Sequence, residues 1–597
     1  MNRLGMTMAI AMGMSGMAFA GTNLVANGDF EGATTGWIKY NTSTGVSTLS
    51  FVDSAAHSGT KGARMHVTAA STENWHVQLK FPVISTVAQT VYRLSYWAKG
   101  PDVSTHVGIS DNAYVYLTGF TQTYTSTWTK FQGTFIGDGT KRRIAASLGL
   151  DTGVYDFDDV VIEAIGVLDS TWYANADTRI DSLRKNDFGV QVLQDGVAAA
   201  DIPVTFQLVR HDFPFGTALN FHDDADDDWY KQMAAKYFWA GVTENAFKWP
   251  QFEPTQDAVD SATVDKVLDW TESQGWALMR GHALEWGIEK YNFASHWSRQ
   301  GTCAEYQVFL KHRIDRDMAF YKGRFRQYDV WNEAFHEPAI FNRCGWELLD
   351  SAFIWAHAAD PTAQLFLNEY SVVAGGETGT FVDLIKGLQA RNIPISGIGA
   401  QCHFGNQVID PAVVAMRLSE LGALGLPIMV TEFDVGDMTD GNLRTAQEQA
   451  DQDAMFIRAA FSHPAVQGII LWGFWDSRHW VPDGGIIEED KTPKLAADSI
   501  WNLWNKDWTT SGTNVSTNAS GLMGFRGFNG KYVVTVGAGI NAQTDTLQFD
   551  ANHRVWTYNM DGSKPLSLQK PARARLVATP AGLRIYDLAG RQLKIKR

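Results

Sequence analysis

Two glutamates, Glu333 and Glu432, each close a run of residues that is otherwise largely apolar. A carboxylic acid that stays protonated can donate its proton to a leaving oxygen. A second carboxyl group that stays ionised can attack the carbon from which that oxygen leaves. This division of roles requires environments that push the two pKa values apart. The pair therefore predicts hydrolysis of a glycosidic bond, provided that the fold brings both side chains to one cleft.

Polar and aromatic residues end further β-rich runs in the same part of the chain. A single strand-end glutamate or histidine is more often solvated or structural, so the prediction depends on their accumulation over seven strand ends. The polar groups would orient the two carboxylates and bind sugar hydroxyls, and the tryptophans would stack on sugar rings. The predicted substrate-binding residues are Glu244, Asn245, Lys248, His282, Trp286, Asn332, Gln401, His403, Trp472 and Trp480.

The elements that position these residues alternate between β-rich and helical. Amphipathic stretches such as 306–323 and 444–463 separate eight β-rich runs, which predicts a (β/α)8 barrel over residues 170–510. In this fold the carboxyl ends of the strands form the active-site face, and runs four and seven lie almost opposite each other. The runs are 214–220, 238–245, 277–286, 326–334, 364–370, 397–404, 427–435 and 466–476.

Regions rich in β-structure flank the predicted barrel, so the chain is expected to be multidomain. Short alternating runs between Gly, Ser, Thr and Asp clusters predict a β-sandwich over residues 21–166. Residues 509–520 are typical of a linker, and residues 521–597 are again β-rich. The basic end, 594–597, would suit cell-surface attachment, a secretion signal or a plain solvated terminus.

The first twenty residues predict a signal peptide and hence a secreted, extracellular protein. Arg3 precedes an apolar run that ends in Ala18-Phe19-Ala20. No other run approaches the ~18 apolar residues that a membrane span needs. In an oxidising compartment Cys303 and Cys344 could pair, which would leave Cys402 free; the sequence leaves that pairing open.

Composition narrows the function classes. The 597 residues carry 50 Lys and Arg against 65 Asp and Glu, a net charge of −15 without basic runs beyond the short tail. Such a chain is a poor binder of nucleic acid or anionic membranes. The absence of a P-loop and of an HExxH motif predicts no nucleotide cofactor and no catalytic metal. The 22 tryptophans suit a neutral ligand with apolar ring faces, such as a sugar.

Six segments in order resemble the glycoside hydrolase family 10 xylanases, over about residues 170–510. Each segment alone is weakly specific, but six in family order are highly specific. They are Gly241-Val242-Thr243-Glu244-Asn245-Ala246-Phe247-Lys248-Trp249, Arg280-Gly281-His282-Ala283-Leu284-Glu285-Trp286, Asp329-Val330-Trp331-Asn332-Glu333-Ala334, Gly397-Ile398-Gly399-Ala400-Gln401-Cys402-His403, Val430-Thr431-Glu432-Phe433-Asp434 and Trp472-Gly473-Phe474-Trp475-Asp476.

The resemblance implies a retaining endo-β-1,4-xylanase that acts on xylan and xylo-oligosaccharides. By motif position, Glu333 would be the acid/base and Glu432 the nucleophile. Asn332 would bond the 2-hydroxyl of the bound sugar, and His403 would orient Glu432. The sequence departs from the family pattern at Glu369, where Asp is usual, and at Gly287, where His or Asn is usual.

The N-terminal module is similar to carbohydrate-binding β-sandwiches of families 4, 9 and 22. The resemblance rests on segments such as Asn27-Gly28-Asp29-Phe30-Glu31. Trp75, Gln78 and Tyr114 are its candidate ligand residues. A structural calcium ion is common in such modules.

Two other functions remain open. A related two-carboxylate barrel could act on β-1,4-glucan or mixed β-glycans. A barrel without turnover could serve as a polysaccharide-binding protein, although the presence of both catalytic glutamates disfavours this.

Overall fold

The computed structural model describes residues 22–111, 116–405, 408–436, 444–560, 563–569, 574–579 and 582–587. The chain divides into two compact units, one formed mainly by residues up to Asp169 and the other mainly by residues from Ser170 onward. No helix within the described ranges is long and apolar enough to cross a membrane. The predicted signal peptide, residues 1–20, lies outside the described residues.

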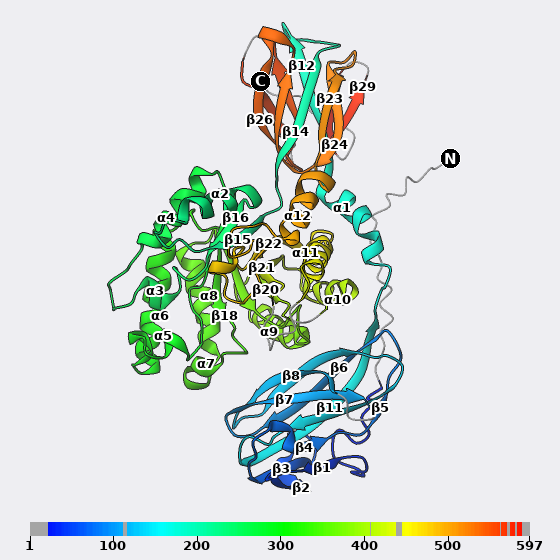
Figure 1. The fold of residues 1–597 in the computed structure, drawn as a ribbon, viewed down its shortest axis with the longest axis vertical. Coiled ribbons are helices and arrows are strands. Elements are labelled where there is room, and N and C mark those ends of the chain that lie inside the picture. Colours follow the sequence, from blue (N-terminus) through cyan, green and yellow to red (C-terminus); the bar gives the residue numbers. More distant parts are fainter. Residues whose placement is uncertain are drawn as a thin grey trace. The chain divides into compact units, whose positions relative to one another are not determined.

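The N-terminal module is a β-sandwich of two antiparallel sheets, as predicted (Figure 1). In β6 every second residue from Tyr92 to Ala98 is buried, which is the period of a strand with one face on a core. One sheet has the order β1 (Ile38–Asn41), β4 (Val77–Lys80), β10 (Lys141–Ser147), β7 (Val103–Asp111), β8 (Tyr116–Tyr124), with β5 (Ile84–Ser85) beside β10; the other has β2 (Val46–Val52), β3 (Gly62–Ala69), β11 (Gly153–Val167), β6 (Thr90–Lys99), β9 (Thr129–Ile136).

The eight predicted runs form eight parallel strands that close into a barrel, which confirms the predicted (β/α)8 fold. Nearly every strand residue is buried, because the strands face the barrel interior on one side and helices on the other. The strands are β15 (Phe215–Leu219), β16 (Ala240–Thr243), β17 (Leu278–Gly281), β18 (Gln327–Asn332), β19 (Gln364–Glu369), β20 (Gly397–His403), β21 (Ile428–Asp434) and β22 (Val466–Leu471).

Helices surround this barrel (Figure 1). Thr302 and Thr445 form capping boxes with Glu305 and Glu448 and so fix the starts of α6 and α11. The helices are α2 (Asp227–Tyr237), α3 (Trp249–Phe252), α4 (Ala262–Ser273), α5 (Tyr291–Ala294), α6 (Cys303–Phe320), α7 (Ala339–Cys344), α8 (Glu347–Ala359), α9 (Thr378–Ala390), α10 (Pro411–Gly422), α11 (Ala446–Phe461) and α12 (Leu495–Asn502).

Segments that precede and follow the barrel in the chain form a second sandwich together. This corrects the expected domain bounds. Residues 185–211 were expected in the barrel domain and residues 509–520 in a linker, but both pair with the C-terminal strands. Phe206 stacks on Phe525 with ring centroids 4.1 Å apart, so the module's core joins residues from before and after the barrel. After α1 (Ala176–Arg184) its strands are β12 (Lys185–Gln194), β13 (Val197–Ala198), β14 (Pro203–His211), β23 (Ser511–Ser516), β24 (Leu522–Phe528), β25 (Gly530–Val536), β26 (Gln543–Phe549), β27 (His553–Asn559) and β28 (Leu566–Gln569), followed by the hairpin β29 (Ala574–Thr579) and β30 (Gly582–Asp587).

One disulfide bond ties the ends of a long barrel segment together. Cys303 and Cys344 are bonded, with their Cα atoms 5.3 Å apart and a sequence separation of 41. This segment contains α6, β18 and Glu333. Cys402 is buried and has no disulfide partner. The pairing that the sequence left open is therefore present in the structure.

Candidate active site

A cleft of about 960 Å³ opens at the carboxyl ends of the barrel strands. All twelve side chains that the sequence singled out in the barrel lie on its wall. Their convergence from strand ends far apart in the sequence follows from the barrel, since parallel strands end on one face. They are Glu244, Asn245, Lys248, His282, Trp286, Asn332, Glu333, Gln401, His403, Glu432, Trp472 and Trp480.

Glu333 follows directly after β18 and is 9% exposed. Its carboxyl group accepts hydrogen bonds from Trp286 Nε1 at 2.8 Å and from the side-chain amides of Asn332 at 3.0 Å and Gln401 at 3.1 Å. Burial, followed by the charges of Glu369 and Glu432, raises the pKa of Glu333 to about 7. Glu333 can therefore hold a proton near neutral pH, as a general acid must.

Glu432 lies on β21 and is 4% exposed. Its two carboxylate oxygens have different partners: Asn368 Nδ2 donates to Oε1 at 2.8 Å, and His403 Nε2 lies 3.3 Å from Oε2. Burial alone would lower the pKa of His403, but the Asp434 and Glu432 carboxylates raise it to about 10. The imidazole of His403 thus contacts two carboxylates, Glu432 and Asp434.

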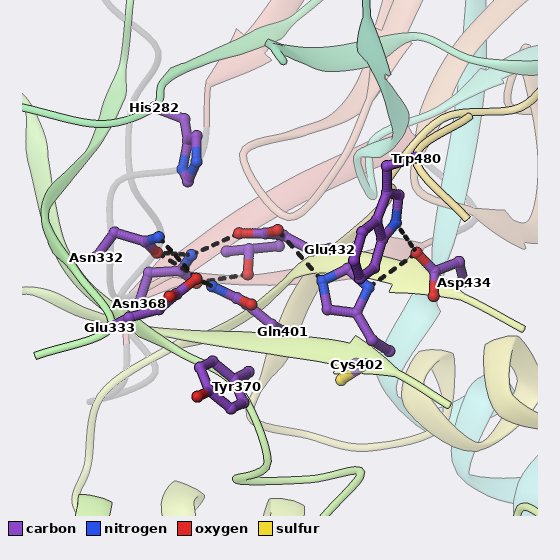
Figure 2. Close-up of polar contacts among 12 residues, drawn as sticks. His282, Asn332, Glu333, Asn368, Tyr370, Gln401, Cys402, Glu432, Asp434 and Trp480 are labelled. Atoms are coloured by element: carbon purple, nitrogen blue, oxygen red, sulfur yellow. Dashed lines mark hydrogen bonds and ion pairs between the residues drawn. The ribbon is translucent and has the colours of Figure 1, made fainter. Parts of the chain in front are cut away.

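Asp434 contacts the other ring nitrogen of His403. Its Oδ2 lies 2.8 Å from His403 Nδ1 and accepts a hydrogen bond from Trp480 Nε1 at 2.8 Å. Burial opposes ionisation of Asp434, but His403 shifts its pKa below the usual range. Figure 2 shows the contact between Asp434 and Trp480.

Side-chain amides connect Glu333 with Glu432 (Figure 2). Asn332 and Asn368 are paired positions on the neighbouring strands β18 and β19. Asn368 Nδ2 donates to Asn332 Oδ1 at 2.8 Å as well as to Glu432, and Thr431 Oγ1 donates to Asn368 Oδ1 at 2.6 Å. Gln401 Nε2 donates to Asn332 Oδ1 at 3.1 Å and to Glu333. A continuous hydrogen-bonded chain thus links the two glutamates.

A buried cation lies at one end of the cleft. Lys248 Nζ donates to Asn245 Oδ1 at 2.9 Å, and Asn245 Nδ2 donates to Glu244 Oε1 at 2.8 Å. The Lys248 ammonium lies 4.7 Å from the centre of the Trp286 ring and 5.8 Å from that of Trp472. Burial lowers the pKa of Lys248, and the glutamates around it oppose that shift. These donors and acceptors, set against tryptophan faces, suit a ligand rich in hydroxyl groups.

His282 is held by the buried Asp329 carboxylate, which pairs with Arg280. Its Nδ1 lies 2.9 Å from Asp329 Oδ2, and the Arg280 guanidinium donates to both Asp329 oxygens at 2.6 and 3.2 Å. Arg280 holds the pKa of the buried Asp329 carboxyl low, although burial opposes this. The His282 ring packs edge-on against Trp472, with centroids 5.0 Å apart.

Sequence reasoning missed three residues that orient the predicted ones: Asn368, Asp329 and Asp434. Asn368 and Asp434 stand at or next to the ends of strands, and Asp329 and Asp434 stand in segments that carried the resemblance. Their position was a usable signal, but nothing in the sequence says which predicted group each contacts.

Two family profiles match this chain. One, described as a carbohydrate binding domain, matches residues 22–145. The other, described as glycosyl hydrolase family 10, matches residues 206–502, a range that contains all eight barrel strands and the cleft. The barrel belongs to glycosyl hydrolase family 10.

Individual relatives match over parts of their length. The anti-sigma-I factor RsgI6 of Acetivibrio thermocellus is 32% identical over 378 residues, which cover 63% of this chain and 48% of that protein. Endo-1,4-beta-xylanase 1 of Arabidopsis thaliana is 30% identical over 367 residues, covering 60% and 37% respectively. The chain thus spans less than half the length of both. Xylanase 10B of Thermotoga petrophila, solved with xylobiose, is 28% identical, with a TM-score of 0.46 over 50% of this chain and 95% of that chain.

The candidate residues of the N-terminal carbohydrate-binding domain are placed in part. Trp75 lies in the short 3-10 turn Asn74–His76 and is 48% exposed. Gln78 lies on β4, opposite Tyr40 of β1 and Ser147 of β10, and its Nε2 donates to Ser147 Oγ at 3.3 Å. Tyr114 lies outside the described residues. The ligand roles of all three stay predictions.

The described residues gather one set of three acidic side chains at metal-binding spacing, and that set is in the family 10 barrel rather than the binding domain. It consists of Asp476, Asp483 and Glu488, and Asp476 already pairs with Lys494 at 2.7 Å. In the binding domain Glu31 accepts from Lys61 N at 2.8 Å, and Asp158 accepts from His57 N at 2.7 Å. A structural calcium ion in the binding domain, which the resemblance allows, stays untested.

Proposed function

We propose that this chain is an endo-β-1,4-xylanase that hydrolyses xylan with retention of anomeric configuration. The observation that carries this proposal is the contrast between two carboxyl groups in one cleft. Glu333 is buried beside other carboxylates and holds its proton to about pH 7, whereas Glu432 is hydrogen-bonded to an amide and to the imidazole of His403. Two glutamates in environments of this kind can act as acid and nucleophile.

In the first step Glu333 donates its proton to the glycosidic oxygen while a Glu432 oxygen bonds to the anomeric carbon. The bond from that carbon to the oxygen breaks, and its electron pair leaves with the oxygen. In the second step Glu333, now ionised, takes a proton from water, and the water oxygen displaces Glu432. Asn332 would bond the 2-hydroxyl, and His403 would keep Glu432 oriented.

The substrate assignment follows from the cleft. Glu244, Asn245 and Lys248 offer a compact set of polar groups against tryptophan faces. A xylose unit lacks the hydroxymethyl group of glucose, so a tight site rejects glucan by steric clash. One relative carries the name endo-1,4-beta-xylanase, and one related structure is a xylanase with bound xylobiose.

The remaining assignments belong to the same proposal. The N-terminal domain binds the polysaccharide that the barrel cuts, through a face that includes Trp75 and Gln78. The protein is secreted after removal of residues 1–20, and the Cys303–Cys344 disulfide supports an oxidising destination. The C-terminal region is a candidate for attachment to a surface, and residues 588–597 lie outside the described residues.

Incubation of the chain lacking residues 1–20 with xylan and, separately, with amorphous cellulose tests the proposal. We expect short xylo-oligosaccharides from xylan and little release from cellulose, with no release from either by the isosteric variant Glu432→Gln. Equal or greater release from cellulose would move the function to β-glucan. Tight xylan binding without turnover would favour a polysaccharide-binding protein.

A further inference from the structure

A third carboxyl group, Glu369, lies buried near Glu333 and has no part in the steps above. It ends β19, directly after Asn368, and its residue is 0% exposed. Its Oε2 accepts from Phe335 N at 3.2 Å, and its Oε1 accepts from Tyr370 N at 3.1 Å and lies 2.7 Å from His336 Nδ1. Of these three partners, Tyr370 lines the cleft, and Phe335 and His336 follow Glu333 closely in the chain.

Two of these partners belong to the loop that carries the acid/base, residues 333–337. Glu337 N donates to Glu333 O at 2.8 Å, and Glu333 N donates to Asn368 O at 2.8 Å, so the loop turns tightly against the end of β19. Phe335 and His336 are held by Glu369 within that turn. The Asn368 carbonyl therefore holds the backbone at Glu333, and the Glu369 carboxyl group holds the loop just after it, so both ends of this turn are tied to β19.

The loop is enclosed on its other faces. The His336 ring stacks on Tyr370, with centroids 3.7 Å apart and planes 15° from parallel. A Cβ atom at Gly287 would lie 2.5 Å from the Glu337 carbonyl oxygen, so the backbone approaches there too closely for any other residue. The loop is thus clamped between β19 and the segment after Trp286, and Glu369 is the charged member of that clamp.

The charge of Glu369 also faces Glu333. The titratable groups acting on Glu333 come from three elements: Glu369 on β19, Glu432 on β21 and, as the opposing cation, Lys248 after β16. Burial raises the pKa of Glu369 itself, while His336 and the backbone N–H groups of Phe335 and Tyr370 oppose that shift and favour the ionised form. In that form Glu369 makes a second negative charge at Glu333 less favourable. Ionised Glu333 consequently has a stronger tendency to regain a proton.

We propose that Glu369 is a positioning residue for Glu333: its carboxylate fixes the loop 333–337 and disfavours a second negative charge beside it. This inference rests on the proposed function. In the first step Glu369 lets Glu333 keep its proton until the glycosidic oxygen takes it. In the second step the same charge makes ionised Glu333 a better acceptor for the proton of the attacking water.

The pH profile of kcat/KM on xylo-oligosaccharides tests the inference. In Glu369→Gln the basic limb of the profile should move to lower pH by about half to one unit, because one neighbouring negative charge is lost. Glu369→Asp keeps the charge but is one methylene shorter, so we expect the wild-type limb with a reduced kcat. Glu289→Gln, which removes an exposed carboxylate in the segment after Trp286, is the matched control and should leave the profile unchanged.

The outcomes separate this inference from the function on which it depends. A wild-type chain that does not cut xylan would reject the proposed function. If the wild type is active and the basic limb of the Glu369→Gln profile coincides with that of the wild type, the role of Glu369 alone is overturned. If Glu369→Gln does not fold, Glu369→Asp takes its place: a folded Glu369→Asp variant with the wild-type kcat would overturn the inference.

Discussion

The side-chain amide of Asn368 donates a hydrogen bond of 2.8 Å to Glu432 Oε1. The same nitrogen donates to Asn332 Oδ1, and Thr431 fixes the amide by donating to its oxygen. One residue thus sets the orientation of the nucleophile and of the amide that leads to the acid/base. Because one amide bonds residues of two other strands, a shift in the register of the barrel strands would break the catalytic arrangement.

Asn368→Ala should therefore lower kcat/KM on xylan by about two orders of magnitude, the usual cost of one donor aimed at a reacting group. Thr431→Val, which removes only the hydroxyl that orients the amide, should cause a smaller loss in the same direction. Steady-state kinetics on xylohexaose, with thermal melting to confirm folding, measures both. A folded Asn368→Ala variant with the wild-type rate would contradict this role.

The proton of Glu333 sets the basic side of the pH profile. Because the pKa of this group is raised to about 7, Glu333 is protonated below that pH and loses its proton above it. Activity on xylan should therefore fall through a midpoint near pH 7 as the pH rises. A rate profile on an unactivated xylo-oligosaccharide checks this; activity that stays constant to pH 9 would be inconsistent with Glu333 as the acid.

Glu333→Ala separates the two steps. Removal of the general acid should reduce hydrolysis of xylan by about 10²- to 10⁴-fold. Bond cleavage in an aryl xylobioside with a good leaving group should survive far better, since that leaving group needs no proton. Glu432→Ala should lose both reactions. Equal losses on both substrates for Glu333→Ala would argue against its role as acid.

The Cys303–Cys344 disulfide should contribute about 2–4 kcal/mol to the stability of the barrel, because it closes a 41-residue segment that is otherwise free in the unfolded chain. The double variant Cys303→Ser, Cys344→Ser should melt at a lower temperature than the oxidised wild type. A reducing agent should lower the melting temperature of the wild type and leave the variant unchanged. Equal melting of all forms would mean that the bond contributes nothing.

The strands that precede the barrel, β12 and β14, should need the C-terminal strands in order to fold. A chain ending at residue 510 leaves β12 and β14 without their partner strands and exposes apolar residues such as Phe188 and Phe206. We expect aggregation or a lowered melting temperature, measured by size-exclusion chromatography and calorimetry. A chain ending at residue 569 keeps those partner strands and serves as the control; equal behaviour of the two would contradict the shared sandwich.

The barrel and most of its site were predictable, since eight β-rich runs and polar or aromatic residues at seven strand ends leave local traces in the sequence. Glu333 and Glu432 could be singled out because an ionisable group at the end of a buried strand is costly without a purpose. The contacts of Asn368 and Asp434 could not, because they depend on which strand ends lie side by side. The second sandwich was missed for the same reason: β14 pairs with β25, more than 300 residues later, and alternation alone does not name a strand's partner.

The central claim is that Glu432 forms a covalent bond to the sugar while Glu333 handles the proton. Trapping with a 2-deoxy-2-fluoro xylobioside that carries a good leaving group, followed by peptide mass spectrometry, tests it most directly. We predict one xylobiosyl adduct per chain, on Glu432, and turnover of that adduct blocked in Glu333→Ala. An adduct on another carboxylate, or inverted product with no adduct from an active enzyme, would contradict the account.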